Sequence, residues 1–249
     1  MKASMSPRAR AFAVAVLLAA GMLHGVCQDT LTLVNGQIQE GKITGVSEGN
    51  VRIKVGPAET AQPLAQVKSA TMVPPAEFPA AMEAWAKKDS SKTISLLVPL
   101  TKQYGGLPAR WVERASATLG EAYLAEDKLP EAEAVIDAFE KAYPDSKSEV
   151  NLARATIALA KNDLKTVRER VEPIVAEAKG VKLASPDKSA VYGQAYYLMG
   201  RVHEFDKKYP EALRDYLTTV TLFHEDAAAV ARSQERADVL VKEKLAVVP

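Results

Sequence analysis

Apolar and polar residues follow two different patterns along the chain, and the change comes at Pro74-Pro75. From residue 29 to 73 they alternate, as at Leu31 and Leu33, and alternation is typical of β-strands with one buried face. These stretches are short and end at turn signals, namely Asn35-Gly36, Ser47-Glu48-Gly49-Asn50 and Gly56-Pro57. We therefore predict a few short strands that curl into a small β-barrel over residues 28–75.

Beyond Pro75 the spacing of apolar residues becomes helical. Stretches rich in Ala, Leu, Glu and Lys are separated by short polar loops, namely Lys88-Asp89-Ser90-Ser91, Glu126-Asp127-Lys128 and Lys161-Asn162-Asp163. These loops recur every thirty-odd residues, and a period of this length indicates a stack of helix–turn–helix units. Because one such hairpin cannot bury its apolar side alone, neighbouring units are expected to stabilise one another.

The clearest unit runs from about Glu113 to Ser146. It has small, aromatic and helix-ending residues at fixed spacings, namely Leu119, Gly120, Tyr123, Ala132 and Pro144. In these residues the unit resembles the tetratricopeptide repeat, a helical hairpin in which the Gly and the Ala lie where the two helices cross. Ser116 and Phe139 depart from the pattern, which implies a locally altered crossing of the helices.

A second copy carries Gly200 and Ala212 of the signature, and two weaker copies bring the predicted count to four hairpins. Residues 180–188 are predicted to form an inserted loop, and residues 225–248 one amphipathic helix that caps the stack. The predicted fold class is thus an α+β, multidomain chain. A small β-barrel is followed, over residues 76–249, by an all-α, tetratricopeptide-like solenoid with a C-terminal capping helix.

The strand-rich part resembles the small SH3-like and Sm-like barrels, through its Asn35-Gly36 turn and its second hairpin. Sm-like barrels often bind RNA. Here the charges balance, with Lys42, Arg52, Lys54 and Lys68 against Asp29, Glu40, Glu48 and Glu59. The segment also lacks Tyr and Trp side chains on which bases could stack. We therefore expect no nucleic-acid partner.

Residues 1–27 have the layout of a secretory signal peptide. Three basic residues precede an uncharged apolar run, namely Lys2, Arg8 and Arg10 before Ala11–Leu23. The run is shorter than the ~20 residues of a membrane-spanning helix. Cleavage after Cys27 leaves a chain that starts at Gln28. In the alternative, Cys27 is lipidated and supplies a membrane contact, although Val26 and His24 depart from lipoprotein signals. Both readings predict export, to the periplasm or the outer membrane.

Composition and motifs exclude several functions. The 249 residues carry 32 basic and 31 acidic side chains, so no overall field attracts nucleic acid or anionic membranes. A single cysteine excludes an internal disulfide and a zinc site built from thiolates. The sequence has no His-Glu-x-x-His, phosphate-loop, nucleophile-elbow or dinucleotide-binding motif. We expect no cofactor and no resident metal, and a metal-dependent enzyme built around His203 is the least favoured alternative.

The tetratricopeptide resemblance implies a binding groove, lined by the first helix of each hairpin and holding a segment of another protein. The positions carried over are Arg114, Glu121 and Leu124 in the second hairpin, and Tyr197, Arg201, Glu204 and Phe205 in the fourth. The two aromatic side chains could instead pack against the insertion or the terminal helix. We predict an exported, non-catalytic adaptor or scaffold for an unidentified protein partner in the bacterial cell envelope. The alternative is a structural component that assembles with itself or with an envelope complex.

Overall fold

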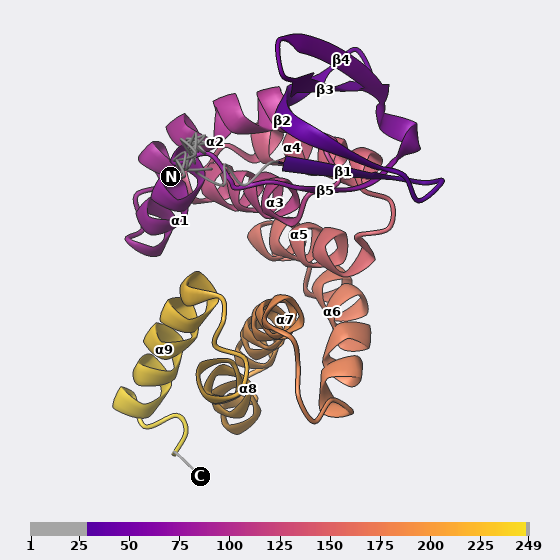
Figure 1. The fold of residues 1–249 in the computed structure, drawn as a ribbon. Coiled ribbons are helices and arrows are strands. Elements are labelled where there is room, and N and C mark those ends of the chain that lie inside the picture. The colour runs from indigo at the N-terminus through magenta and orange to yellow at the C-terminus, as the bar shows by residue number, and fades with distance from the viewer. Residues whose placement is uncertain (1–28, 248–249) are drawn as a thin grey trace, which may run out of the picture.

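The computed structural model describes residues 29–247, and it begins with a five-stranded antiparallel sheet (Figure 1). The strands are β1 (Asp29–Leu33), β2 (Ile38–Ser47), β3 (Asn50–Val55), β4 (Ala58–Pro63) and β5 (Val67–Thr71). They lie in the order β4-β3-β2-β1-β5, so that β1 pairs with both β2 and β5. The predicted turn between β1 and β2 is present, with Gly36 at a φ of +85°.

The sheet is open, which corrects the predicted closed barrel. β4 and β5 are its two edges, and they are not hydrogen-bonded to each other. The side chains of β4 are almost all exposed, so this strand has no apolar face that could close onto β5. The chain that follows contacts β5 instead, because the Ala70 amide donates to the Pro108 carbonyl (2.8 Å). The predicted signal peptide, residues 1–27, lies outside the described residues.

Nine helices follow the sheet in the described part of the chain. They are α1 (Glu77–Ala86), α2 (Ser90–Tyr104), α3 (Arg110–Ala125), α4 (Leu129–Ala142), α5 (Lys147–Ala160), α6 (Leu164–Lys179), α7 (Pro186–Phe205), α8 (Tyr209–Thr221) and α9 (Ala227–Lys242). The first eight pair as four consecutive hairpins. α7 begins inside the predicted insertion, because the Ser185 hydroxyl caps its N-terminus. The inserted loop is therefore shorter than expected.

The four hairpins share one kind of turn. One residue in each turn has a positive φ of between 57° and 60°: Lys88, Asp127, Asn162 and Lys207. In each case the next amide donates to the carbonyl five residues earlier, as from Lys128 to Tyr123 (2.9 Å). This Schellman arrangement ends a helix and turns the chain back. The recurring polar loops of the sequence are these turns.

Glycines lie where the helices of a hairpin approach each other. A Cβ atom added at Gly120 would be 2.7 Å from Cδ1 of Ile136 in α4. One added at Gly200 would be 2.5 Å from the Tyr216 ring in α8. Such distances leave no room for a methyl group. The remaining signature positions are also packed or helix-ending: Leu119, Ala132 and Ala212 are buried, Tyr123 is half-buried, and Pro144 follows the end of α4.

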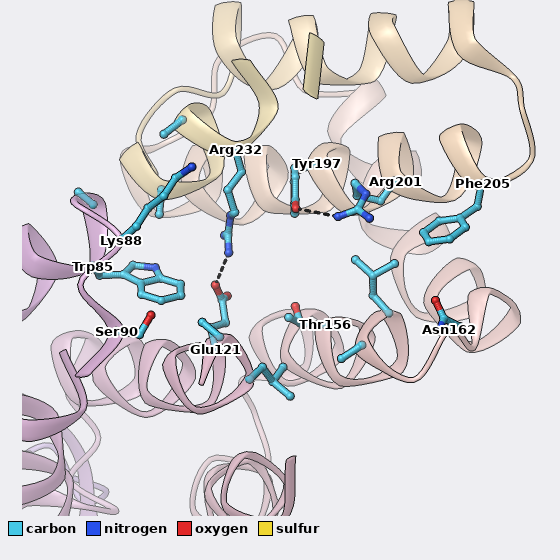
Figure 2. Close-up of a pocket in the computed structure, with 17 residues that line it drawn as sticks. Trp85, Lys88, Ser90, Glu121, Thr156, Asn162, Tyr197, Arg201, Phe205 and Arg232 are labelled. Carbon is cyan, nitrogen blue, oxygen red and sulfur yellow. Dashed lines mark hydrogen bonds and ion pairs between the residues drawn. The ribbon is translucent and has the colours of Figure 1, made fainter. Parts of the chain in front are cut away.

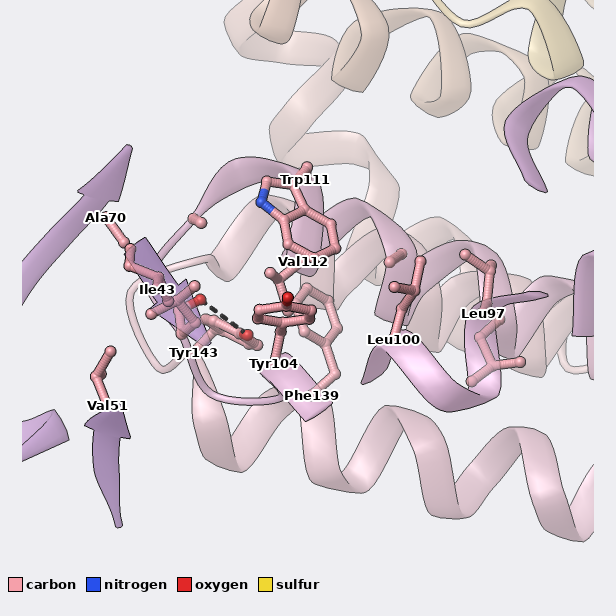
Figure 3. Packing of buried hydrophobic residues seen from close by; sticks show 14 of the residues in the cluster. Ile43, Val51, Ala70, Leu97, Leu100, Tyr104, Trp111, Val112, Phe139 and Tyr143 are labelled. Atoms are coloured by element: carbon pink, nitrogen blue, oxygen red, sulfur yellow. Dashed lines mark hydrogen bonds between the residues drawn. The ribbon is translucent and has the colours of Figure 1, made fainter. Parts of the chain in front are cut away.

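The sheet and the first hairpins share one core. Leu31, Ile43 and Ile53 are buried on one face of the sheet, as the alternating pattern predicts. This face packs against α1–α4, and Gln103 of α2 donates from Nε2 to the Thr44 carbonyl of β2 (2.8 Å). Figure 3 shows the aromatic part of this core, where side chains of the sheet meet those of α2, α3 and the end of α4.

A second core joins α6 to α9, and the two cores meet at α5. This helix contributes Ile157 to the first cluster and Leu152 to the second. Tyr143 ties the loop before α3 to the second hairpin, since its hydroxyl donates to the Leu107 carbonyl (3.1 Å) and accepts from the Gly106 amide (2.9 Å). Burial raises the pKa of this hydroxyl, so it stays protonated and able to donate.

The helical array bends back on itself, so that its last helix approaches its first (Figure 1). α9 packs against α7 and α8 and also contacts α1. Nζ of Lys88, in the first hairpin turn, lies 2.5 Å from Oε2 of Glu235 in α9. α9 was predicted to cap the last hairpin, and in the structure it also joins the end of the array to its beginning.

Candidate functional site

A cavity of about 620 Å³ lies inside the bend of the helical array (Figure 2). Most of its lining comes from α9 and from α1, α3, α5 and α7, which are the first helices of the four hairpins, and Ser90 at the start of α2 and the turn residues Lys88 and Asn162 complete it. Most lining side chains are apolar, and this volume is within the range of ligand-binding clefts, ~300–1,000 Å³. The lining includes five of the seven predicted groove residues: Glu121, Leu124, Tyr197, Arg201 and Phe205.

Arg232 of α9 reaches across the cavity toward α3. Its Nη1 lies 2.8 Å from Oε2 of Glu121, and Gln194 donates to the other oxygen of this carboxylate. The guanidinium carbon is 5.0 Å from the ring centroid of Tyr197 and 5.7 Å from that of Trp85. Burial lowers the pKa of Arg232, but the charge of Glu121, its hydrogen bond and the neighbouring Tyr197 and Asp226 together outweigh burial, and the net shift is upward. One charged side chain thus joins α9 to α1, α3 and α7.

Arg201 also lines the cavity, but it has few polar partners. Its Nη1 donates to the Tyr197 hydroxyl at 3.4 Å, which is long for a hydrogen bond. Its Nε is buried and has no hydrogen-bond partner among the described residues. The guanidinium carbon lies 5.6 Å from the centroid of the Phe205 ring. Because a guanidinium has five N–H donors, most of those on Arg201 are available to a ligand or to water.

Glu204 was predicted to line the groove, but it is not part of the cavity lining. Its carboxylate accepts hydrogen bonds from Arg236 of α9, with Nε at 3.1 Å, and from the Tyr216 hydroxyl of α8 at 2.7 Å. These contacts turn the side chain toward the neighbouring helices. Glu204 therefore holds α7, α8 and α9 together.

Arg114 was also predicted to line the groove, and it lies on a smaller cavity of about 290 Å³, of which Glu121 forms a part. Glu113 is nearby, and its carboxylate accepts a hydrogen bond from the Ser146 hydroxyl (2.5 Å). Burial raises the pKa of Glu113, while this hydrogen bond and the charge of Arg110 oppose the shift. Arg114 and Arg201 thus belong to different cavities.

Several lining residues were not predicted from the sequence, among them Trp85, Thr156, Leu159 and Arg232. Trp85, Leu124 and Leu159 each stand three residues before the positive-φ residue of their own hairpin turn. Aligning the hairpins on their polar loops would therefore have identified Trp85 and Leu159. Arg232 lies outside the repeats, and no local pattern in the sequence points to it.

His203, the centre of the predicted enzymatic alternative, is paired with a carboxylate. Its Nδ1 lies 2.7 Å from Oδ2 of Asp215, between α7 and α8. Burial raises the pKa of Asp215, and the hydrogen bond with His203 opposes that shift. Within residues 29–247, no group of three or more His, Cys, Asp and Glu side chains is arranged to hold a metal ion.

Across the same part of the chain, none of the helices has the length and apolar character needed to cross a membrane. No family model, no curated protein and no solved structure matches this chain. The resemblance to tetratricopeptide repeats therefore depends on the signature residues themselves.

Proposed function

We propose that this protein is a non-catalytic adaptor that binds a short segment of a protein partner in the cavity between α1, α3, α5, α7 and α9. One observation carries the proposal. Glu121, Leu124, Tyr197, Arg201 and Phe205 come from two hairpins far apart in the sequence, and all of them line this cavity. Aromatic and Arg side chains often dominate binding energy at protein interfaces, because they combine apolar area with directed hydrogen bonds.

Three features support a tetratricopeptide-like array as the framework of this adaptor. The four hairpins have the same Schellman turn, and Gly120 and Gly200 lie at close helix approaches. The first helix of every hairpin lines the cavity, as the resemblance implies for a concave binding surface. Because α9 also lines the cavity, the occupant should be a short segment and not a folded domain.

An exported location completes the proposal and depends on residues 1–27. The partner is then a component of the periplasm or the outer membrane. Mass spectrometry of the mature N-terminus distinguishes the two forms of export. A chain that starts at Gln28 indicates simple cleavage, whereas a lipid-modified Cys27 indicates membrane tethering. An N-terminus that retains Met1 would contradict export by a cleaved signal.

Replacing Arg201 and Phe205 together tests the binding function. We expect Arg201→Ala/Phe205→Ala to reduce capture of the partner from envelope extracts by about tenfold or more, because it removes a charge and an aromatic ring from the cavity wall. The melting temperature should change little, since residue Phe205 is 46% exposed.

Arg214→Ala/Leu222→Ala is the matched control. Both residues are exposed and lie outside the cavity lining, and the pair likewise removes one Arg and one large exposed apolar side chain. This control should capture the partner as the wild type does. Equal capture by the cavity variant and the control would contradict the proposed function.

A second candidate function is self-assembly through the edge of the sheet. β4 pairs only with β3, its side chains are almost all exposed, and Glu59 is its single charged residue. An open strand edge with little charge can pair with another chain. Light scattering over a wide range of concentrations separates the candidates: a monomer throughout removes self-assembly, whereas a dimer that Ala61→Lys dissociates supports it.

A further inference from the structure

The charged side chains that line the cavity differ in how closely each is paired with an opposite charge. Three of them are basic, Lys88, Arg201 and Arg232, and one is acidic, Glu121. Arg232 is bound to Glu121 at 2.8 Å, and Lys88 contacts Glu235 at 2.5 Å. Arg201 has no comparable contact among the described residues. The cavity therefore carries an excess of positive charge, and that excess is concentrated at Arg201.

Glu204 is the nearest carboxylate to Arg201, and it is engaged elsewhere. Its Oε2 lies 3.9 Å from Arg201 Nε, beyond hydrogen-bond distance. The same carboxylate accepts hydrogen bonds from Arg236 and from the Tyr216 hydroxyl. It cannot turn toward Arg201 without giving up those bonds. Arg201 is thus held near a carboxylate that does not satisfy its donors.

The cavity wall around Arg201 combines apolar side chains with neutral polar ones. Figure 2 shows Arg201 and Phe205 on α7, facing Thr156 and Asn162 across the cavity. Leu159 belongs to the same lining. In such surroundings a bond between ions is stronger than in bulk water. An occupant that fits this wall needs apolar groups for Phe205 and Leu159 and an anion for Arg201.

We infer that the occupant is an acidic peptide, an extended segment with apolar side chains and one Asp or Glu whose carboxylate is bound by Arg201. This inference rests on the proposed function and names the chemistry of the partner segment. A carboxylate presents two oxygens in the geometry of the guanidinium fork, and such a pair forms two parallel hydrogen bonds. The excess positive charge of the lining disfavours basic segments.

Two pools of synthetic peptides test this inference on the full-length protein. Both contain hexapeptides with blocked termini and varied apolar residues at five positions, and the remaining position is Glu in one pool and Gln in the other. We expect the protein to retain the Glu pool about tenfold more strongly, which is the size of effect given by a hydrogen bond to a charged group. Arg201→Gln should abolish this preference, and Arg201→Lys should restore part of it.

The control and the contrary outcomes are distinct. Arg214→Gln, an exposed change on α8 outside the cavity lining, should keep the preference for Glu. Equal retention of both pools overturns the inference, and it leaves the proposed function intact if Phe205→Ala lowers both. Retention of neither pool overturns both proposals.

Two further results would contradict the inference in other ways. A Glu preference that survives Arg201→Gln excludes Arg201 as the anion contact. Tighter binding of free octanoate than of any Glu peptide identifies a small-molecule site instead.

Discussion

At the scale of single residues, Gly200 determines how closely α7 approaches α8. An added Cβ would meet the ring of Tyr216, which is fully buried and also donates a hydrogen bond to Glu204. We expect Gly200→Ala to lower the free energy of unfolding by about 1–3 kcal/mol, because the ring must move within a packed core. Urea denaturation measures the change.

Gly180→Ala is the control for this prediction. An added Cβ there would lie 3.6 Å from the Glu177 carbonyl oxygen, an ordinary contact. Its φ of −88° suits any residue, so the stability should stay within about 0.5 kcal/mol of the wild type or rise slightly. If the two substitutions had equal effects, the tight approach at Gly200 would be disproved.

Glu113 gives a prediction about pH. Burial raises its pKa above the ordinary value of 4.5, so the folded protein holds this proton more strongly than the unfolded chain. The stability that the proton contributes is fully present below pH 4.5, and it is lost as the pH rises through the folded-state pKa. The unfolding free energy of the wild type minus that of Glu113→Gln should therefore fall from pH 4.5 to neutral pH. A difference that is flat or that rises with pH would contradict this.

Some residue-scale features can be predicted from the sequence and others cannot. Gly120 and Gly200 could be identified because the need for a small residue arises within one hairpin. In each case the helix that approaches the glycine is the next one along the chain. Glu204 lies outside the cavity lining, because Arg236 on a later helix holds its carboxylate. Arg114, like the other predicted groove residues, was carried over from the resemblance, and the structure places it on a different cavity.

At the scale of elements, the contact between α9 and α3 depends on one ion pair. The Glu121 side chain is 9% exposed and that of Arg232 is 24% exposed, so removing either leaves the other charge partly buried and unpaired. Glu121→Gln and Arg232→Met should each cost about 2 kcal/mol, and the double variant should cost less than their sum. A double-mutant cycle in urea measures the coupling.

The pair Lys88 and Glu235 is the matched control, because it also joins α9 to the first hairpin. Its side chains are 65% and 58% exposed, so a cycle on this pair should give about 0.5 kcal/mol or less. A coupling at Glu121 and Arg232 that is no larger than this would show that the buried pair does not hold α9 in place.

Strands, turns and helices that have a signal in their own stretch of sequence could be predicted. The way in which these elements pack together was harder to predict. Alternating residues and the Asn35-Gly36 turn gave the first strands, and polar loops marked the hairpin turns. The pairing of β5 with the chain beyond the sheet had no local signal, because the Ala70 amide donates to the carbonyl of the distant Pro108. The helical start at Pro186 was missed because a short polar stretch with a proline suits both a loop and a first helical turn.

At the scale of the whole molecule, closure of the array changes the kind of binding surface that the repeats predict. Glu121 and Arg232 are 111 residues apart in sequence, and no periodic pattern links them. Their contact joins α9 to α3 beside the cavity, which the first helices of the hairpins also line. The positions carried over from the resemblance therefore include five lining residues on α3 and α7 and none on α9.

Photo-crosslinking from inside the cavity tests the central claim most directly. A benzophenone side chain is placed at Phe205, and in a control at Val98 of α2, which is similarly exposed, 38% against 46%, and lies outside the cavity lining. After illumination of cells that make the protein, mass spectrometry should find one partner attached at position 205, through an acidic and apolar segment, and none at position 98. The same adducts from both positions, or none from position 205, would contradict a binding role for the cavity.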